Sequence, residues 1–230
     1  VALRSLIMPT TYKYFTFLSV LFVTVLLVSN IVSTKITDLG WFVFDAGTLL
    51  FPIVYILGDV FTEVYGFKKS RSVIWMGFFA TLLMAIVLIV VGKLPPASDW
   101  GNQAAYDAIL GLTPRIVIAS LLAYFCGELV NAIILAKMKI MTAGKHLWMR
   151  TIGSSAVAQM VDTGIFAVVA FWGVLPNELL ISVVVSNYVF KLGMEILFTP
   201  LTYKTVAFLK KREQVDHYDR GTNFNPFILG

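Results

Sequence analysis

The sequence has almost none of the residues that metal centres, disulfides and catalytic triads require. Its one cysteine, Cys126, excludes an internal disulfide and a cysteine metal cluster. The two histidines, His146 and His217, do not form a pair with metal-ligand spacing, and no span contains a serine–histidine partner or a Gly-x-Gly-Asp protease motif. No Walker motif for ATP binding occurs either. These absences predict a protein that is not an enzyme and that holds no metal or cofactor.

Charged residues are also scarce. They make up 13% of the 230 residues, whereas 58% are hydrophobic and the mean hydropathy is +0.83. A soluble domain of this size could not bury so much apolar surface, and runs of about 20 apolar residues can cross a bilayer as helices. The sequence therefore predicts an all-α integral membrane protein with a single domain over residues 1–230 and a cytoplasmic tail at 210–230. Its six transmembrane helices are predicted at about 14–34, 46–64, 72–92, 116–136, 151–173 and 180–203.

The basic residues are distributed unevenly between the loops. If the N-terminus is cytoplasmic, 14 lysines and arginines lie on the cytoplasmic side, in the segments 4–13, 68–71, 137–150 and 204–220. Only Lys35, Lys93 and Arg115 lie outside, and Lys191 lies within a span. Because cytoplasmic loops carry the excess of positive charge, both termini are predicted to be cytoplasmic. The net charge of +5 then reflects topology, and no direct binding of nucleic acid is expected.

Polar residues in the middle of four predicted spans are the main candidates for a binding site. Within each span they are three or four residues apart, which places them on one helical face. A charged group at the bilayer centre costs about 2.5–3.5 kcal/mol on insertion scales, so these faces are expected to point inward. The candidate substrate-binding residues are Asp59, Glu63, Glu128, Asn131, Gln159, Asp162, Asn187, Lys191 and Glu195.

Two interpretations of these residues are open. They could bind a ligand, or they could join the helices through hydrogen bonds that contribute about 0.6 kcal/mol each in membranes. Under the second interpretation, Lys191 and Asp162 form a buried ion pair, and Glu63 pairs with Lys68 or Arg71. The whole set favours a ligand, because five acids accompany one lysine and desolvation opposes so large an uncompensated charge.

Three stretches together resemble the queuosine precursor transporters of the vitamin uptake transporter family: GDVFTEVYGFKKSRSVIW, AQMVDTGIFAVVAFWG and NYVFKLGMEILFTPL. Their order and spacing carry the resemblance, which covers nearly the whole chain, including the tail. It implies a six-helix, multi-pass protein of the bacterial inner membrane that imports a 7-deazaguanine such as preQ0 or preQ1, the cyano and aminomethyl precursors of a tRNA nucleoside. The residues at the family's polar motif positions are Asp59, Glu63, Gln159, Asp162, Asn187 and Lys191.

A 7-deazaguanine suits such a site. Its guanine-like edge presents two adjacent donors, a ring N–H and an amine, which one carboxylate can accept together. Its carbonyl oxygen needs a donor, for which the candidates are Lys191, Asn131, Asn187 and Gln159. Its flat ring needs an apolar or aromatic slot, and the aromatic candidates are Phe125, Phe166 and Tyr188. Asp59, Asp162 and Lys191 are the central residues of this hypothesis.

Other functions and several properties stay open at this stage. The chain could be the substrate-binding module of a multi-component vitamin-type transporter that needs a separate ATPase, or a scaffold of polar contacts without a ligand. The sequence does not reveal the preferred 7-deazaguanine, the driving force, or whether the chain forms a homodimer. The outer loop at 93–115 is expected to be a connector rather than a lid, and Pro200 is expected to bend or end the membrane part of the last span. Residues 221–230 either pack on the cytoplasmic face or are disordered.

Overall fold

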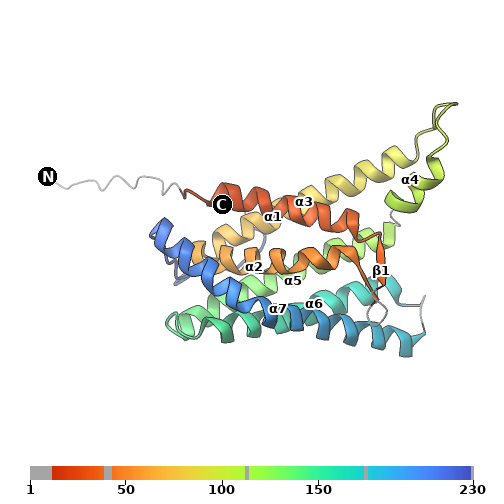
Figure 1. The fold of residues 1–230 in the computed structure, drawn as a ribbon. Coiled ribbons are helices and arrows are strands. Elements are labelled where there is room, and N and C mark those ends of the chain that lie inside the picture. Colours follow the sequence, from red (N-terminus) through yellow and green to blue (C-terminus); the bar gives the residue numbers. More distant parts are fainter. Residues whose placement is uncertain (1–11, 39–42, 112–113, 174–175, 229–230) are drawn as a thin grey trace.

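The computed structural model describes residues 12–38, 43–111, 114–173 and 176–228, and these form an almost wholly helical bundle (Figure 1). The long helices follow the apolar runs of the sequence, because a backbone in lipid must satisfy its own hydrogen bonds. They are α1 (Phe15–Val32), α2 (Phe51–Val60), α3 (Phe67–Gly92), α5 (Pro114–Met141), α6 (Leu147–Phe171) and α7 (Asn177–Glu213). Shorter elements are the 3-10 turn η1 (Ala46–Leu50), the π-helical turn η2 (Phe61–Tyr65) and α4 (Gln103–Leu110).

Successive long helices run in opposite directions along the bundle, so their ends gather at two faces (Figure 1). α5 packs on α3 and α6, and α6 packs on α7. The short helix α2 lies against α1, α5 and α7, and η2, which continues it, has all five residues buried. This enclosed position brings the side chains of α2 into contact with three other helices.

Within the described part of the chain, four helical segments are long and apolar enough to cross a membrane: α1, α3, α6 and the segment Gln103–Met141, which contains α4 and α5. Large apolar side chains such as Phe17, Leu83 and Val168 are exposed on these helices, as lipid-facing residues are. The predicted class is therefore confirmed as a multi-pass helical membrane protein. The predicted span at 46–64 corresponds to η1, α2 and η2, and the span at 180–203 lies within α7. Neither is among these four segments.

The structure adds detail in three places where the sequence predicted a loop or a break. A short antiparallel hairpin precedes η1 and pairs β1 (Ile36–Asp38) with β2 (Val43–Asp45), with Ile36 opposite Asp45. The outer connector contains α4, which packs back on α3 through a hydrogen bond from the Tyr106 hydroxyl to the Leu88 carbonyl (3.4 Å). Pro200 lies inside α7, which continues to Glu213, so the proline does not end the helix.

The tail packs against the face where α2 ends and α3 begins. Asp219 accepts hydrogen bonds from the Phe67 backbone N–H at the start of α3, at 3.0 and 3.2 Å to its two oxygens. Arg71 donates to two backbone carbonyls of the tail at 2.6 and 3.2 Å, and the Trp75 indole N–H donates to the Pro226 carbonyl at 2.8 Å. Of the two alternatives for the tail, the part up to residue 228 thus packs on the bundle.

Candidate substrate site and ion-pair network

The structure separates the nine predicted polar residues into three groups. Glu63, which lies on η2, forms ion pairs with Arg150 and Lys210. Asn187 is exposed on α7. The other seven gather around α2, where they connect this helix with α5, α6 and α7. We call these seven residues the central cluster: Asp59, Glu128, Asn131, Gln159, Asp162, Lys191 and Glu195.

Asp59 and Asn131 form a buried contact in the central cluster. Asp59, near the end of α2, is 1% exposed, and its Oδ1 accepts a hydrogen bond from Asn131 Nδ2 on α5 (3.0 Å). The other side-chain oxygens, Asp59 Oδ2 and Asn131 Oδ1, are buried and accept no hydrogen bond from an amide, hydroxyl or cationic donor of the described residues. Buried polar atoms in folded proteins are nearly always paired, with protein, water or ligand. Two neighbouring side chains therefore each present an unused acceptor.

Lys191 and Asp162 form the ion pair that the sequence suggested as one alternative. Lys191 Nζ on α7 lies 2.5 Å from Asp162 Oδ2 on α6, and the two side chains keep 18% and 23% of their surface exposed. Lys191 Nζ also lies 5.6 Å from the centre of the Phe51 ring on α2, within cation–π range. The remaining exposed surface leaves both groups accessible to a ligand.

Glu128 and Glu195 bring two more carboxyl groups to α2. Glu128 lies against Gly58, where an added Cβ would come within 3.1 Å of Glu128 Oε2, so the glycine permits this close approach. The Glu195 carboxyl is within hydrogen-bonding reach of Asp59, and its charge interacts with that of Glu128. Among the described residues, no lysine or arginine nitrogen lies within 4.0 Å of the carboxylates of Asp59, Glu128 or Glu195.

The aromatic residues beside the central cluster are Tyr55 and Phe51, which the sequence analysis did not select. Tyr55 hydrogen-bonds to Gln159 and interacts with the charge of Asp162. The Phe51 and Tyr55 rings have centroids 6.0 Å apart. Residues 51, 55 and 59 follow each other at intervals of four, which places both rings on the helical face of Asp59. This spacing is the signal by which sequence reasoning could have found them.

The predicted aromatic candidates lie elsewhere or make other contacts. Phe125 packs against α3, with its ring centroid 4.6 Å from that of Trp75 and 5.3 Å from that of Phe78. Phe166 pairs with Phe171, 5.6 Å away on the same helix. Tyr188 is half-buried on α7. Phe125 and Phe166 lie three and four residues from Glu128 and Asp162, so helical spacing alone did not determine which neighbours their rings contact.

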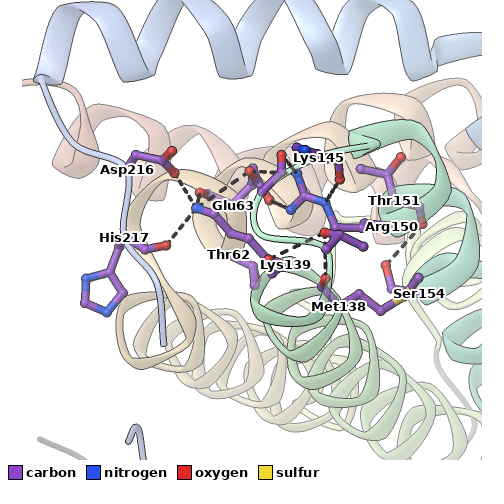
Figure 2. A network of polar contacts seen from close by, with 12 residues as sticks. Thr62, Glu63, Met138, Lys139, Lys145, Arg150, Thr151, Ser154, Asp216 and His217 are labelled. Atoms are coloured by element: carbon purple, nitrogen blue, oxygen red, sulfur yellow. Dashed lines mark hydrogen bonds and ion pairs between the residues drawn. The ribbon is translucent and has the colours of Figure 1, made fainter. Parts of the chain in front are cut away.

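Glu63 lies one turn beyond Asp59 and is fully buried in a network of cations (Figure 2). Arg150 on α6 donates to both of its carboxylate oxygens, with Nη2 at 3.2 Å from Oε1, and Lys210 Nζ on α7 lies 2.6 Å from Oε1. Lys68, suggested as an alternative partner, is exposed, and Arg71 points to the tail instead. The chain reverses at Gly66 before α3, which turns that helix's basic residues away from Glu63.

Lys139 and Asp216 join this network to the tail (Figure 2). Lys139, 1% exposed, donates to the Glu63 backbone carbonyl at 2.6 Å and to Asp216 Oδ1 at 2.5 Å. Lys210 Nζ lies 2.9 Å from the same Asp216 oxygen. Burial alone would raise the pKa of Asp216, but the hydrogen bonds from Lys139 and Lys210 outweigh it and lower that pKa below its ordinary value. We call the five residues Glu63, Lys139, Arg150, Lys210 and Asp216 the ion-pair network.

These features define a class of protein. Helices that cross a membrane enclose a cluster of polar side chains with unpaired acceptors, which is the arrangement of a small-molecule transporter. Within the described residues, no three His, Cys, Asp or Glu side chains are grouped so that they could hold a metal ion. The chain belongs to the family described as "Putative vitamin uptake transporter", whose profile matches residues 45–205. This range contains the whole central cluster.

Three relatives extend the comparison. The chain is 29% identical over 187 residues to the "Probable queuosine precursor transporter" of Bacillus subtilis (strain 168), covering 81% of this chain and 82% of that protein. It is 23% identical over 191 residues to the "Queuosine precursor transporter" of Escherichia coli (strain K12), covering 81% and 83%. A "Probable queuosine precursor transporter" of Haemophilus influenzae is 27% identical over 146 residues, covering 61% and 60%. No solved structure gives a significant match.

Proposed function

We propose that this protein imports a queuosine precursor, a 7-deazaguanine such as the 7-cyano or 7-aminomethyl form, across the bacterial inner membrane without altering it chemically. The names of the three relatives support this substrate class. The central cluster supports a small polar ligand held among the helices, because its polar groups come from four elements and include unpaired acceptors.

We also propose that six segments cross the membrane. These are the four apolar segments, the continuous segment formed by η1, α2 and η2, and α7. The described chain begins and ends at the same face, where the backbone N–H of Tyr14 donates to Glu213 (2.7 Å). Lys139, Arg150 and Lys210 also meet at this face. Since basic residues concentrate on the cytoplasmic side, these contacts support a cytoplasmic location for both termini.

The observation that carries the proposed substrate is the pair of unused acceptors on Asp59 and Asn131. A guanine-like edge offers two adjacent donors, which can satisfy Asp59 Oδ2 and Asn131 Oδ1 together. Asp162, which the sequence also favoured for this role, is already held by Lys191 at 2.5 Å. Asp59 is therefore the better acceptor for the substrate.

The remaining members of the site can meet the other needs of the ligand. Lys191 keeps exposed surface and can donate to the carbonyl oxygen of a 7-deazaguanine. Phe51 and Tyr55 form an aromatic edge on the face of α2 that carries Asp59, and they can cover the flat ring. Gln159 holds the Tyr55 hydroxyl and so orients this edge.

A binding measurement tests the assignment of Asp59. Asp59→Asn keeps the size of the side chain but replaces an acceptor by a donor, opposite a donor on the ligand. An unmatched buried polar contact costs about 1–3 kcal/mol, so the Kd of purified protein for 7-cyano-7-deazaguanine should rise about tenfold or more. Asp99→Asn, in the exposed outer connector, is the matched control and should bind like the wild type. Unchanged affinity in a monodisperse Asp59→Asn sample would contradict the assignment.

Reconstitution tests the transport function itself. Uptake of labelled 7-cyano-7-deazaguanine by liposomes that contain only this protein supports an autonomous importer. Binding without uptake would instead indicate a substrate-binding module that needs a separate ATPase, and neither binding nor uptake would indicate a scaffold. Competition by the unsubstituted base, the cyano form and the aminomethyl form ranks the substrates.

A further inference from the structure

Two buried carboxyl groups in the central cluster lie close together, and no lysine or arginine of the described residues pairs with either of them. Asp59 is 1% exposed and Glu195 is 3% exposed, and the two carboxyls are within hydrogen-bonding reach. The nearby cations are engaged elsewhere: Lys191 pairs with Asp162 at 2.5 Å, and Arg150 pairs with Glu63. Neither the Lys191–Asp162 pair nor the ion-pair network around Glu63 therefore places a cation in contact with Asp59 or Glu195.

Two carboxyl groups in this position cannot both be ionised. Like charges in a desolvated site repel each other strongly, and two carboxyls form a hydrogen bond only when one of them carries a proton. The pair behaves as one unit that binds a shared proton. Asp59 Oδ2 accepts no hydrogen bond from an amide, hydroxyl or cationic donor of the described residues, so it is available to a proton or a ligand.

The hydrogen bonds decide which carboxyl holds the proton. Asp59 accepts a hydrogen bond from Asn131 Nδ2 at 3.0 Å, which stabilises its ionised form. Among the described residues, no donor other than the partner carboxyl lies within hydrogen-bonding distance of the Glu195 side chain. The proton therefore resides on Glu195, which donates to Asp59. A carboxylate has about four acceptor sites, so Asp59 can receive Asn131, Glu195 and a ligand together.

The surroundings of the pair contain one further unpaired acid and two compensated ones. Among the described residues, Glu128 has no cation partner, whereas Asp162 is in contact with one cation and Glu63 with three. The titratable and charged groups that face the pair are Tyr55 on α2, Glu63 on η2, Glu128 on α5, Arg150 and Asp162 on α6, and Lys191 on α7.

We propose that Glu195 is the coupling site of this transporter: it carries a proton that enters the cell together with the substrate. This inference rests on the proposed function, and it identifies the proton gradient as the driving force of substrate uptake. The substrate binds to ionised Asp59 while Glu195 is protonated, so one proton accompanies each substrate. After the substrate leaves toward the more alkaline cytoplasm, Glu195 releases its proton. An inward proton gradient then drives accumulation of the substrate.

The first test measures proton movement with the wild-type protein. Liposomes that contain the protein are supplied with labelled 7-cyano-7-deazaguanine, which is uncharged, and with a pH indicator outside. An inside-alkaline gradient should raise the steady-state uptake several-fold, a protonophore should remove this increase, and substrate addition should make the outer medium more alkaline. An equal sodium gradient without a pH gradient should have no effect.

The second test uses Glu195→Gln, whose amide resembles a permanently protonated carboxyl. This variant should retain measurable exchange of external labelled substrate for internal unlabelled substrate, at a lower rate than the wild type because Glu195 contacts Asp59. It should lose the response to the pH gradient and the substrate-induced alkalinisation. Glu178→Gln, at the exposed start of the same helix, is the matched control and should keep both.

Three outcomes would overturn the proposal. These are wild-type uptake that ignores the pH gradient, uptake driven by sodium instead, and a Glu195→Gln variant that still accumulates substrate in response to the pH gradient. In each of them transport itself persists, so the proposed function would stand. If the wild type showed no binding, exchange or uptake at all, the proposed function would fail and the coupling site with it.

Discussion

At the scale of single residues, Asp59 and Glu63 are only four residues apart on one helical face, yet their charges have opposite surroundings. Among the residues that the structure describes, Asp59 has a hydrogen bond from Asn131 and no paired cation, whereas Glu63 is enclosed by Arg150 and Lys210. An acid without a counter-charge can change its protonation or accept a ligand. An acid that is held by two cations stabilises the fold instead.

The role of Glu63 can be tested by removing its charge. Glu63→Gln leaves buried Arg150 without its acid, and loss of one partner of a buried ion pair costs about 3–5 kcal/mol. For a chain of this size, the apparent Tm in detergent should fall by roughly 10 °C. Asp99→Asn in the exposed connector should leave the Tm unchanged. A wild-type Tm for Glu63→Gln would show that the network does not stabilise the fold.

The stability contribution of Asp216 should depend on pH. Burial alone would raise its pKa, but hydrogen bonds from Lys139 and Lys210 lower it, so ionised Asp216 stabilises the folded state above its ordinary pKa of about 4. This contribution is lost as the pH falls through the lowered pKa. Asp216→Asn should therefore unfold at a lower temperature than the wild type at pH 7, and the two Tm values should converge below about pH 3. A difference that persists at low pH would point to packing rather than charge.

At the scale of elements, the turn between η2 and α3 determines where the tail docks. Gly66 has φ 85° and ψ 166°, a conformation that is essentially restricted to glycine. An added Cβ would also collide with the His217 ring of the tail. Gly66→Ala should cost about 1–3 kcal/mol in stability and loosen the tail, so trypsin should cleave at Lys211 and Arg212 faster.

A matched glycine provides the control for this experiment. Gly101, in the outer connector, has no atom within 4 Å of an added Cβ. Gly101→Ala should therefore keep the wild-type rate of tryptic cleavage and the wild-type Tm. If Gly66→Ala also kept them, the contact between the turn and the tail would not hold the tail in place.

At the scale of the whole molecule, the proposed topology predicts which residues are accessible from outside the cell. With Cys126 replaced by alanine, single cysteines at Lys68 and Ser98 would lie on opposite sides of the membrane, and both positions are exposed in the structure. An impermeant thiol reagent should label position 98 in intact cells and position 68 only after the membrane is opened. Labelling of position 68 but not 98 in intact cells would reverse the orientation.

The class of the protein could be predicted from the sequence, and so could the polar positions that meet around α2. Hydropathy and charge distribution are sums over neighbouring residues, so they indicated membrane helices, and helical spacing placed Asp59, Gln159 and Lys191 on polar faces without any coordinates. The packing of one helix on another is not such a local property. It selects partners such as Glu63 and Lys210, which are 147 residues apart in the chain.

How the polar residues divide between two environments followed from helix packing. Glu63 lies among cations, whereas Asp59 and Glu195 lie close together with no paired cation among the described residues. Helix packing also brought Tyr55, rather than Phe125, to the central cluster. The physical reason is the same in each case. A side chain's charge balance depends on which surfaces the helices bury against each other, and in a membrane every buried polar group must find its partner across such a contact.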